Sequence, residues 1–102
     1  MTEVNLADYR RDVNWLAVPH RANEALRRLM AAGSAATEVV REGLQHADPV
    51  VRVGCCKVLD HFMDEAAVPA LIANLTHPDE QVRCWAMHAL ACDKCKEGAC
   101  RP

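Results

Sequence analysis

The sequence predicts an all-α fold, specifically an α-α superhelix of about two and a half stacked pairs of antiparallel helices. Three observations lead to this prediction. Two segments of the chain repeat each other at a constant offset, apolar residues recur within them at helical spacing, and aromatic residues make up only 4% of the composition. A core poor in aromatic rings must be filled by small and medium aliphatic side chains, and such cores suit closely packed helices.

The repeat is clearest between residues 44–60 and residues 75–91. Leu44 aligns with Leu75, and the offset of 75 − 44 = 31 residues also holds for the aspartates, arginines and later leucines of the two segments. A period of this length is typical of stacked helical hairpins, because each hairpin buries its apolar face only against its neighbours. A weaker copy precedes them over residues 20–43.

Each repeat is expected to open with a helix that has a defined start. Asp48 can accept hydrogen bonds from the free amides of the first turn, and Asp79 repeats this cap. Pro49 fits the first helical position because its missing N–H is not needed there. The apolar residues that follow fall at i, i+4, i+7, i+8 and i+11, which places them on one face of a helix. In the earlier segment they are Val51, Cys55, Val58, Leu59 and Phe62.

The second helix of the repeat is expected over the stretch DEAAVPALIANL. Pro69 is tolerated only in the first turn, so this helix should begin near Ala66 or Ala67. One repeat earlier the matching stretch is SAATEVVREGL, with Ser34 as the expected cap. The predicted inward residues of the later helix are Val68, Leu71, Ile72 and Leu75.

The domain prediction is a single repeat domain over residues 1–102. Residues 1–18 are expected to form an N-terminal capping helix, residues 19–46 and 47–77 the helical repeats, and residues 78–102 a half repeat with a Cys-rich C-terminal loop. The half repeat has no second helix. We therefore expect an apolar flank that a second copy of the chain in a homodimer, a ligand or the C-terminal loop would cover. The inward residues of the capping helix are expected to be Leu6, Tyr9, Val13 and Leu16.

The segments DPVVRVGCCKVL, EAAVPALIANL and HPDEQVRCWAMHAL resemble HEAT repeats. The family pattern has an Asp before the first helix, Val-Arg within it, then a small residue and a Leu, and a second helix that contains Pro. HEAT arrays mostly serve as binding scaffolds, so the resemblance implies a non-catalytic module for protein–protein interaction. The positions that match are Asp48, Val51, Arg52, Cys55 and Leu59, and then Asp79, Val82, Arg83, Ala86 and Leu90.

The second helices are expected to offer the face that a protein partner contacts. Its exposed polar positions are predicted to be Glu38, Glu42, Gln45 and Asn74. Some proteins that resemble HEAT arrays are enzymes, namely hydroxylases, bilin lyases and DNA glycosylases. The sequence has no His-Glu dipeptide of the hydroxylase type and no basic surface for a glycosylase, so only a lyase-type subunit stays open as the enzymatic alternative.

Two residue types recur at matching positions and are expected to have structural roles. Arg52 and Arg83 each follow an inward Val and are predicted to reach the capping Asp of their own or the neighbouring repeat, forming a ladder. His46 and His77 each follow a second helix, where a donor can satisfy terminal carbonyls.

Composition limits the classes of partner and the compartment. The formal net charge of −2 argues against nucleic-acid binding, which needs a basic stripe. No signal-peptide pattern is visible, and no apolar run approaches the roughly 20 residues that a bilayer span requires. We therefore expect no membrane association and a cytoplasmic protein, in which thiols stay reduced. Among the cysteines, Cys55, Cys56 and Cys84 lie between apolar residues and are expected to fill the core.

A cluster of soft metal ligands follows the last predicted helix. The stretch HALACDKCKEGAC places His88, Cys92, Cys95 and Cys100 at the spacing H-x3-C-x2-C-x4-C. His88 and Cys92 would lie one turn apart on the same helix face. Four such ligands suit a tetrahedral Zn²⁺ with no open position, so we predict a structural zinc site. Free thiols beside an ordinary histidine, or a metal-sensing or redox-responsive cluster, are the alternatives.

Overall fold

A computed structural model describes residues 6–62 and 64–91 of the chain, which form six α-helices and two short 3₁₀ helices and contain no strand. A 3₁₀ helix, η1, precedes α3, and another, η2, precedes α5. None of the helices in this part of the chain is long and apolar enough to cross a membrane. The α-helices are α1 (Leu6–Trp15), α2 (Ala22–Ala32), α3 (Thr37–Gly43), α4 (Pro49–His61), α5 (Val68–Asn74) and α6 (Glu80–Ala91).

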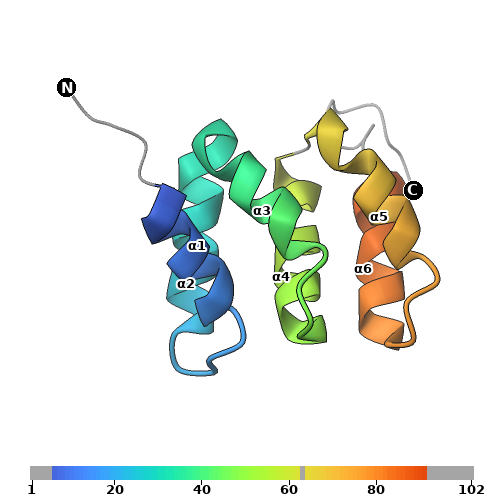
Figure 1. Ribbon diagram of the computed structural model, residues 1–102, viewed down its shortest axis with the longest axis horizontal. Helices are drawn as coiled ribbons and strands as arrows, with labels where there is room; N and C mark the ends of the chain where they lie inside the picture. The colour runs from blue at the N-terminus through green and yellow to red at the C-terminus, as the bar shows by residue number, and fades with distance from the viewer. Residues whose placement is uncertain (1–5, 63, 92–102) are drawn as a thin grey trace.

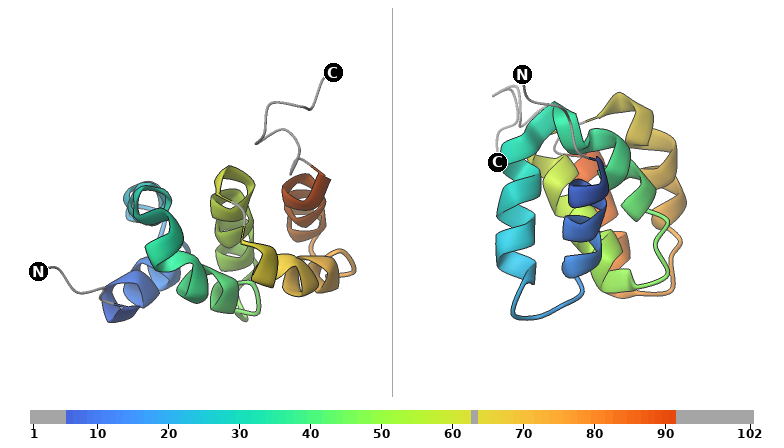
Figure 2. Two further views of the ribbon diagram at one scale, coloured as in Figure 1. Left: turned by 90° about the horizontal axis from the view of Figure 1, so that it is seen from above. Right: turned by 60° about the vertical axis from the view of Figure 1, so that its left-hand side comes forward.

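The six helices lie in two layers (Figures 1 and 2). One layer holds α1, α3 and α5, and the other holds α2, α4 and α6. Across the layers α1 packs against α2, α3 against α4 and α5 against α6, and within the second layer α4 packs against α6. Helix α1 lies in the layer of second helices beside α3 and covers the first hairpin from that side (Figure 2).

The aspartate caps of α4 and α6 are confirmed. Asp48 Oδ1 accepts a hydrogen bond of 2.9 Å from the Val50 N–H, and Pro49 occupies the first turn. Asp79 Oδ1 accepts from the amides of Gln81 and Val82 at 2.8 and 3.2 Å. Both helices therefore begin where the sequence predicts, because a short acceptor side chain satisfies the first free amides.

The starts of the second helices differ from the prediction. Ser34 does not cap α3; it lies inside the 3₁₀ helix Gly33–Ala36, and α3 begins at Thr37 without a side-chain cap. Gly33 has φ +57°, a left-handed conformation that glycine adopts at little cost and that ends α2. Before α5, the residues 65–67 form the second 3₁₀ helix, η2, and the α-helix itself starts at Val68.

The core lies between the two layers and consists mainly of small aliphatic residues. The predicted inward positions are buried or partly buried except for Ile72, which is 53% exposed, and Phe62, which is 39% exposed, so these two predictions were wrong. Cys84 is also exposed, whereas Cys55 and Cys56 are buried as predicted. The largest fully buried side chains include Leu29, Leu44, Leu59, Leu71, Val39, Val40, Val51, Val58 and Val82.

Candidate interaction groove

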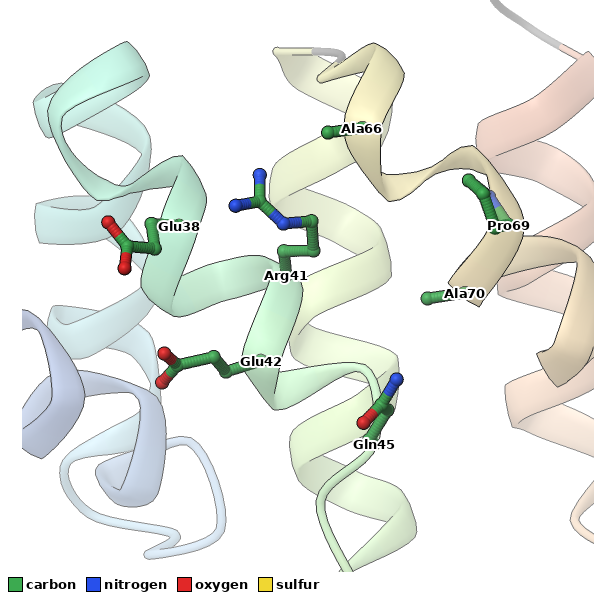
Figure 3. Close-up of a pocket in the computed structure, with 7 residues that line it drawn as sticks. All are labelled: Glu38, Arg41, Glu42, Gln45, Ala66, Pro69 and Ala70. Carbon is green, nitrogen blue, oxygen red and sulfur yellow. The ribbon is translucent and has the colours of Figure 1, made fainter.

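A groove of about 350 Å³ lies between α3 and the beginning of α5 (Figure 3). Three of the four polar residues that the sequence assigns to the interaction face line it from α3 and the turn that follows, namely Glu38, Glu42 and Gln45. The opposite side consists of small side chains, Ala66 and Ala70, together with Pro69. The groove thus has one polar wall and one apolar wall made of short side chains.

An ion pair joins the two walls at one end of the groove. Arg41 Nη1 donates to Asp64 Oδ2 over 2.6 Å, and both side chains are only partly exposed. Asp64 also accepts a hydrogen bond of 3.2 Å from the Ala66 N–H through its other oxygen. Asp64 both caps the 3₁₀ helix η2 and pairs with Arg41 of α3. This double contact therefore fixes the spacing between α3 and the segment that leads into α5.

A second ion pair holds the polar wall from the other side. The Arg10 guanidinium of α1 donates two hydrogen bonds, of 3.0 and 3.1 Å, to the two carboxylate oxygens of Glu42. The hydrogen bond from Arg10 lowers the pKa of Glu42, and the same contact raises the pKa of Arg10. Both side chains are half exposed, so salt screens the pair. The pair orients Glu42 toward α1, and the other polar side chains that line the groove are Glu38, Arg41 and Gln45.

The fourth predicted residue, Asn74, is buried rather than exposed, with a relative accessibility of 1%. Its Nδ2 donates to the carbonyls of Leu44 and Ala70, each over 3.0 Å, and its Oδ1 accepts from Arg52 Nη1 over 2.6 Å. Asn74 therefore connects α5 both to the end of α3 and to α4. The sequence does carry a signal for this position, because Asn74 lies three residues after the core residue Leu71 and so shares its helix face.

The predicted arginine ladder to the capping aspartates was wrong. Arg52 Nε donates to the His46 carbonyl over 2.7 Å, and Arg83 Nη1 donates to the His77 carbonyl over 2.8 Å. These carbonyls follow the second helices and lack helical partners, whereas the Asp48 carboxylate already accepts a backbone amide. The arginines thus satisfy free carbonyls in both repeats.

The recurring histidines are structural, as predicted, but through a different contact. His46 Nδ1 accepts a hydrogen bond of 3.0 Å from the Asp48 N–H, and His77 Nδ1 accepts one of 3.0 Å from the Asp79 N–H. The imidazole rings therefore bind the amide of the capping residue rather than terminal carbonyls. This role explains why the same residue type stands at the same place in two repeats.

Of the predicted zinc ligands, only His88 lies within the described residues; Cys92, Cys95 and Cys100 lie outside them. His88 Nδ1 is 3.3 Å from Asp60 Oδ1, and its ring stacks on Trp85 with centroids 5.2 Å apart. Within residues 6–62 and 64–91, no three His, Cys, Asp or Glu side chains are arranged to hold a metal ion.

Two layers of antiparallel helices, with the same cap and the same arginine contact in successive units, define a solenoid of helical repeats. A comparison with family profiles agrees with this class, because the profile for HEAT repeats matches residues 6–91. The chain belongs to the HEAT repeat family, and both the resemblance and the α-α superhelix predicted from the sequence are confirmed. Comparisons with curated proteins and with solved structures gave no match.

Proposed function

We propose that this HEAT repeat module is a non-catalytic scaffold that holds a segment of a partner protein in the groove between α3 and α5. HEAT repeat modules are typically protein-interaction scaffolds. The observation that carries the proposal is the groove itself, because three of the residues assigned to the binding face by the repeat pattern line it. The cytoplasm is the compartment that we propose, on the basis of the sequence.

The construction of the groove supports binding rather than catalysis. Its walls are fixed by the Arg41–Asp64 ion pair and by the buried hydrogen bonds of Asn74. A preformed surface binds a partner without first ordering its own side chains, which lowers the entropic cost of association. Glu38 and Gln45 offer hydrogen-bonding groups to the partner, and Ala66, Pro69 and Ala70 leave room for its apolar side chains.

Site-specific photo-crosslinking tests this proposal. A photoreactive residue is placed at Gln45 in the groove and, as a matched control, at Arg27, which is exposed on α2 in the opposite layer. We expect irradiation in a cell extract to give a defined covalent adduct with one protein from position 45 only. The adduct should disappear when Ala70 is replaced by Arg, which fills the groove. Adducts of equal yield from both positions, or none, contradict the proposal.

We also propose that His88 holds a structural zinc ion together with Cys92, Cys95 and Cys100. The contact between His88 Nδ1 and Asp60 supports this, because zinc-binding histidines commonly donate their second ring N–H to a carboxylate. Because Asp60 engages Nδ1, we propose Nε2 as the atom that would bind the metal.

Elemental analysis of the reduced protein tests the zinc site. About one equivalent of zinc is expected, and its removal by a chelator should lower the melting temperature, since a structural ion contributes to folding. His88→Ala should lose the metal, whereas the control His61→Ala on α4 should keep it. A metal-free protein rules the site out, and metal loss without a change in melting temperature favours a sensor.

A further inference from the structure

The layer of α2, α4 and α6 carries a second hollow surface. One cavity of about 220 Å³ lies between α4 and α6, and a smaller one of about 140 Å³ lies between α2 and α4. Both cavities are lined by Val50, Val53 and Lys57, so they meet across α4. We call this surface, with Leu26 at the α2 side and Trp85 at the α6 side, the α4 trough.

The α4 trough faces away from the groove between α3 and α5. At 100° per residue, Val50, Val53 and Lys57 share one side of α4. Val51 and Cys55, which point into the core, are fully buried, whereas Val50 is 54% exposed. The trough is therefore an apolar surface on the opposite layer, and the core does not use it.

The charges of the trough indicate what it binds. Lys57 is the only charged residue that lines the cavity beside α2. In the cavity beside α6 the other charged residue is Asp79, whose carboxylate caps α6 by accepting two backbone amides. Lys57 Nζ lies 5.1 Å from the centre of the Trp85 ring, and within the described residues it has no carboxylate at ion-pair distance. A single ammonium group between apolar walls is complementary to a carboxylate flanked by apolar side chains.

We propose that the α4 trough binds an acidic segment of a partner protein. Apolar side chains of this segment enter the cavities on either side of α4, and an Asp or Glu between them pairs with Lys57. Trp85 adds to recognition because its ring forms one wall and positions the ammonium group. The trough gives the module a second contact surface besides the groove, so that one chain holds two segments at once.

Selection from a random peptide library displayed on phage tests the proposal with defined probes. The immobilised protein is expected to enrich peptides in which Asp or Glu lies between apolar residues. The best peptide, made synthetically, should bind about tenfold more weakly or worse to Lys57→Glu at low salt, because the charge pair becomes a repulsion. The same peptide should bind Arg27→Glu, a charge-matched control on α2, and Ala70→Arg in the other groove as well as it binds the unchanged protein.

Three results would overturn the proposal. They are enrichment of no peptide, enrichment of peptides without acidic residues, and equal binding to Lys57→Glu and Arg27→Glu. The other possible occupant of the trough is a second copy of the chain, and analytical ultracentrifugation of the unchanged protein and of Lys57→Glu tests for it. If that substitution alone converts a dimer into a monomer, the trough holds a second copy of the chain instead of an acidic partner.

Discussion

Asn74 links two repeats through a single buried side chain. It donates to a carbonyl of its own helix and to Leu44 at the end of α3, while accepting from Arg52 of α4. Apolar contacts between stacked helices allow some sliding, but these three hydrogen bonds are directional. They fix the register of α5 against α3 and hence the width of the groove between them.

Replacing Asn74 by Ala is expected to lower the free energy of unfolding by about 2–4 kcal/mol. The substitution leaves the buried Leu44 carbonyl and one Arg52 donor without partners, and unsatisfied buried groups are costly. Urea unfolding followed by circular dichroism measures the change. The control Gln45→Ala, at a neighbouring exposed residue, should cost less than about 0.5 kcal/mol. Equal midpoints for the two variants would mean that the hydrogen bonds contribute nothing net.

The two buried thiols should make the free energy of unfolding decrease as the pH rises into the alkaline range. Burial raises the pKa of Cys56 from its usual 9.0 to about 12, and it also raises the pKa of Cys55. Above pH 9 the unfolded chain therefore loses thiol protons that the folded chain keeps, and stability falls until the folded groups ionise. We expect the unfolding free energy of the unchanged protein to fall more steeply between pH 8.5 and about 10.5 than that of Cys56→Ala. Parallel curves for the two proteins contradict this.

At single positions the sequence predicted local contacts better than distant ones. Asp48 and Asp79 were identified as caps because the amides that they bind are two or three residues away. The partners of Arg52 include Asn74, which is 22 residues away, and spacing alone does not show that contact. Asn74 itself was assigned to the surface because asparagine is polar, although its position on the Leu71 face pointed inward.

Among the helices, the start of α4 was predicted closely and the approach to α3 was not. The caps and the proline of α4 are local signals that the sequence displays directly. The 3₁₀ helix Gly33–Ala36 depends on the left-handed Gly33 and on how α2 meets the next helix, so Ser34 was misread as a cap. Polar residues before an apolar run do not distinguish a helix start from a short 3₁₀ turn.

The contact between α3 and α4 depends on the absence of a side chain at Gly43. A Cβ at this position would overlap the Cys55 Sγ and lie 2.9 Å from Val13 Cγ1. Gly43→Ala is therefore expected to cost about 1–3 kcal/mol in unfolding free energy, despite the better helix propensity of Ala. Thermal or urea unfolding provides the measurement.

A double variant separates this overlap from other effects. Cys55→Ala removes the sulfur atom that the new methyl group meets, so Gly43→Ala should cost less in the Cys55→Ala background than in the unchanged protein. If the effects of the two substitutions on the unfolding free energy are strictly additive, the helices adjust so that residue 43 and residue 55 do not clash.

For the whole molecule, the repeat predicted stacked helices and an exposed face on the second helices, but it did not predict the groove in that face. Glu38 on α3 and Gln45 in the turn after it both line the groove. The α4 trough was not predicted, since it depends on the hollows left beside α4 by particular neighbours such as Leu26 and Trp85. Spacing in a sequence indicates which side of a helix is exposed, but not the shape of the space beside it.

Among the described residues, the two most exposed large apolar side chains outside the trough lie on α5 and α6: Ile72 at 53% and Met87 at 61%. Burial of these side chains in a contact between copies would remove apolar surface from water. We expect the chain to form a reversible homodimer through this pair, seen as a rise in sedimentation coefficient with concentration. Met87→Lys should shift the protein to monomer, because the dimer would bury an unpaired ammonium group.

The control for this test is Val50→Lys, which places the same charge in the α4 trough and should leave the dimer intact. Dissociation by Val50→Lys but not by Met87→Lys would move the contact between copies to the trough. A monomer at every concentration contradicts the homodimer. Neither Met87 nor Val50 lines the groove between α3 and α5, so neither substitution alters the lining of that groove.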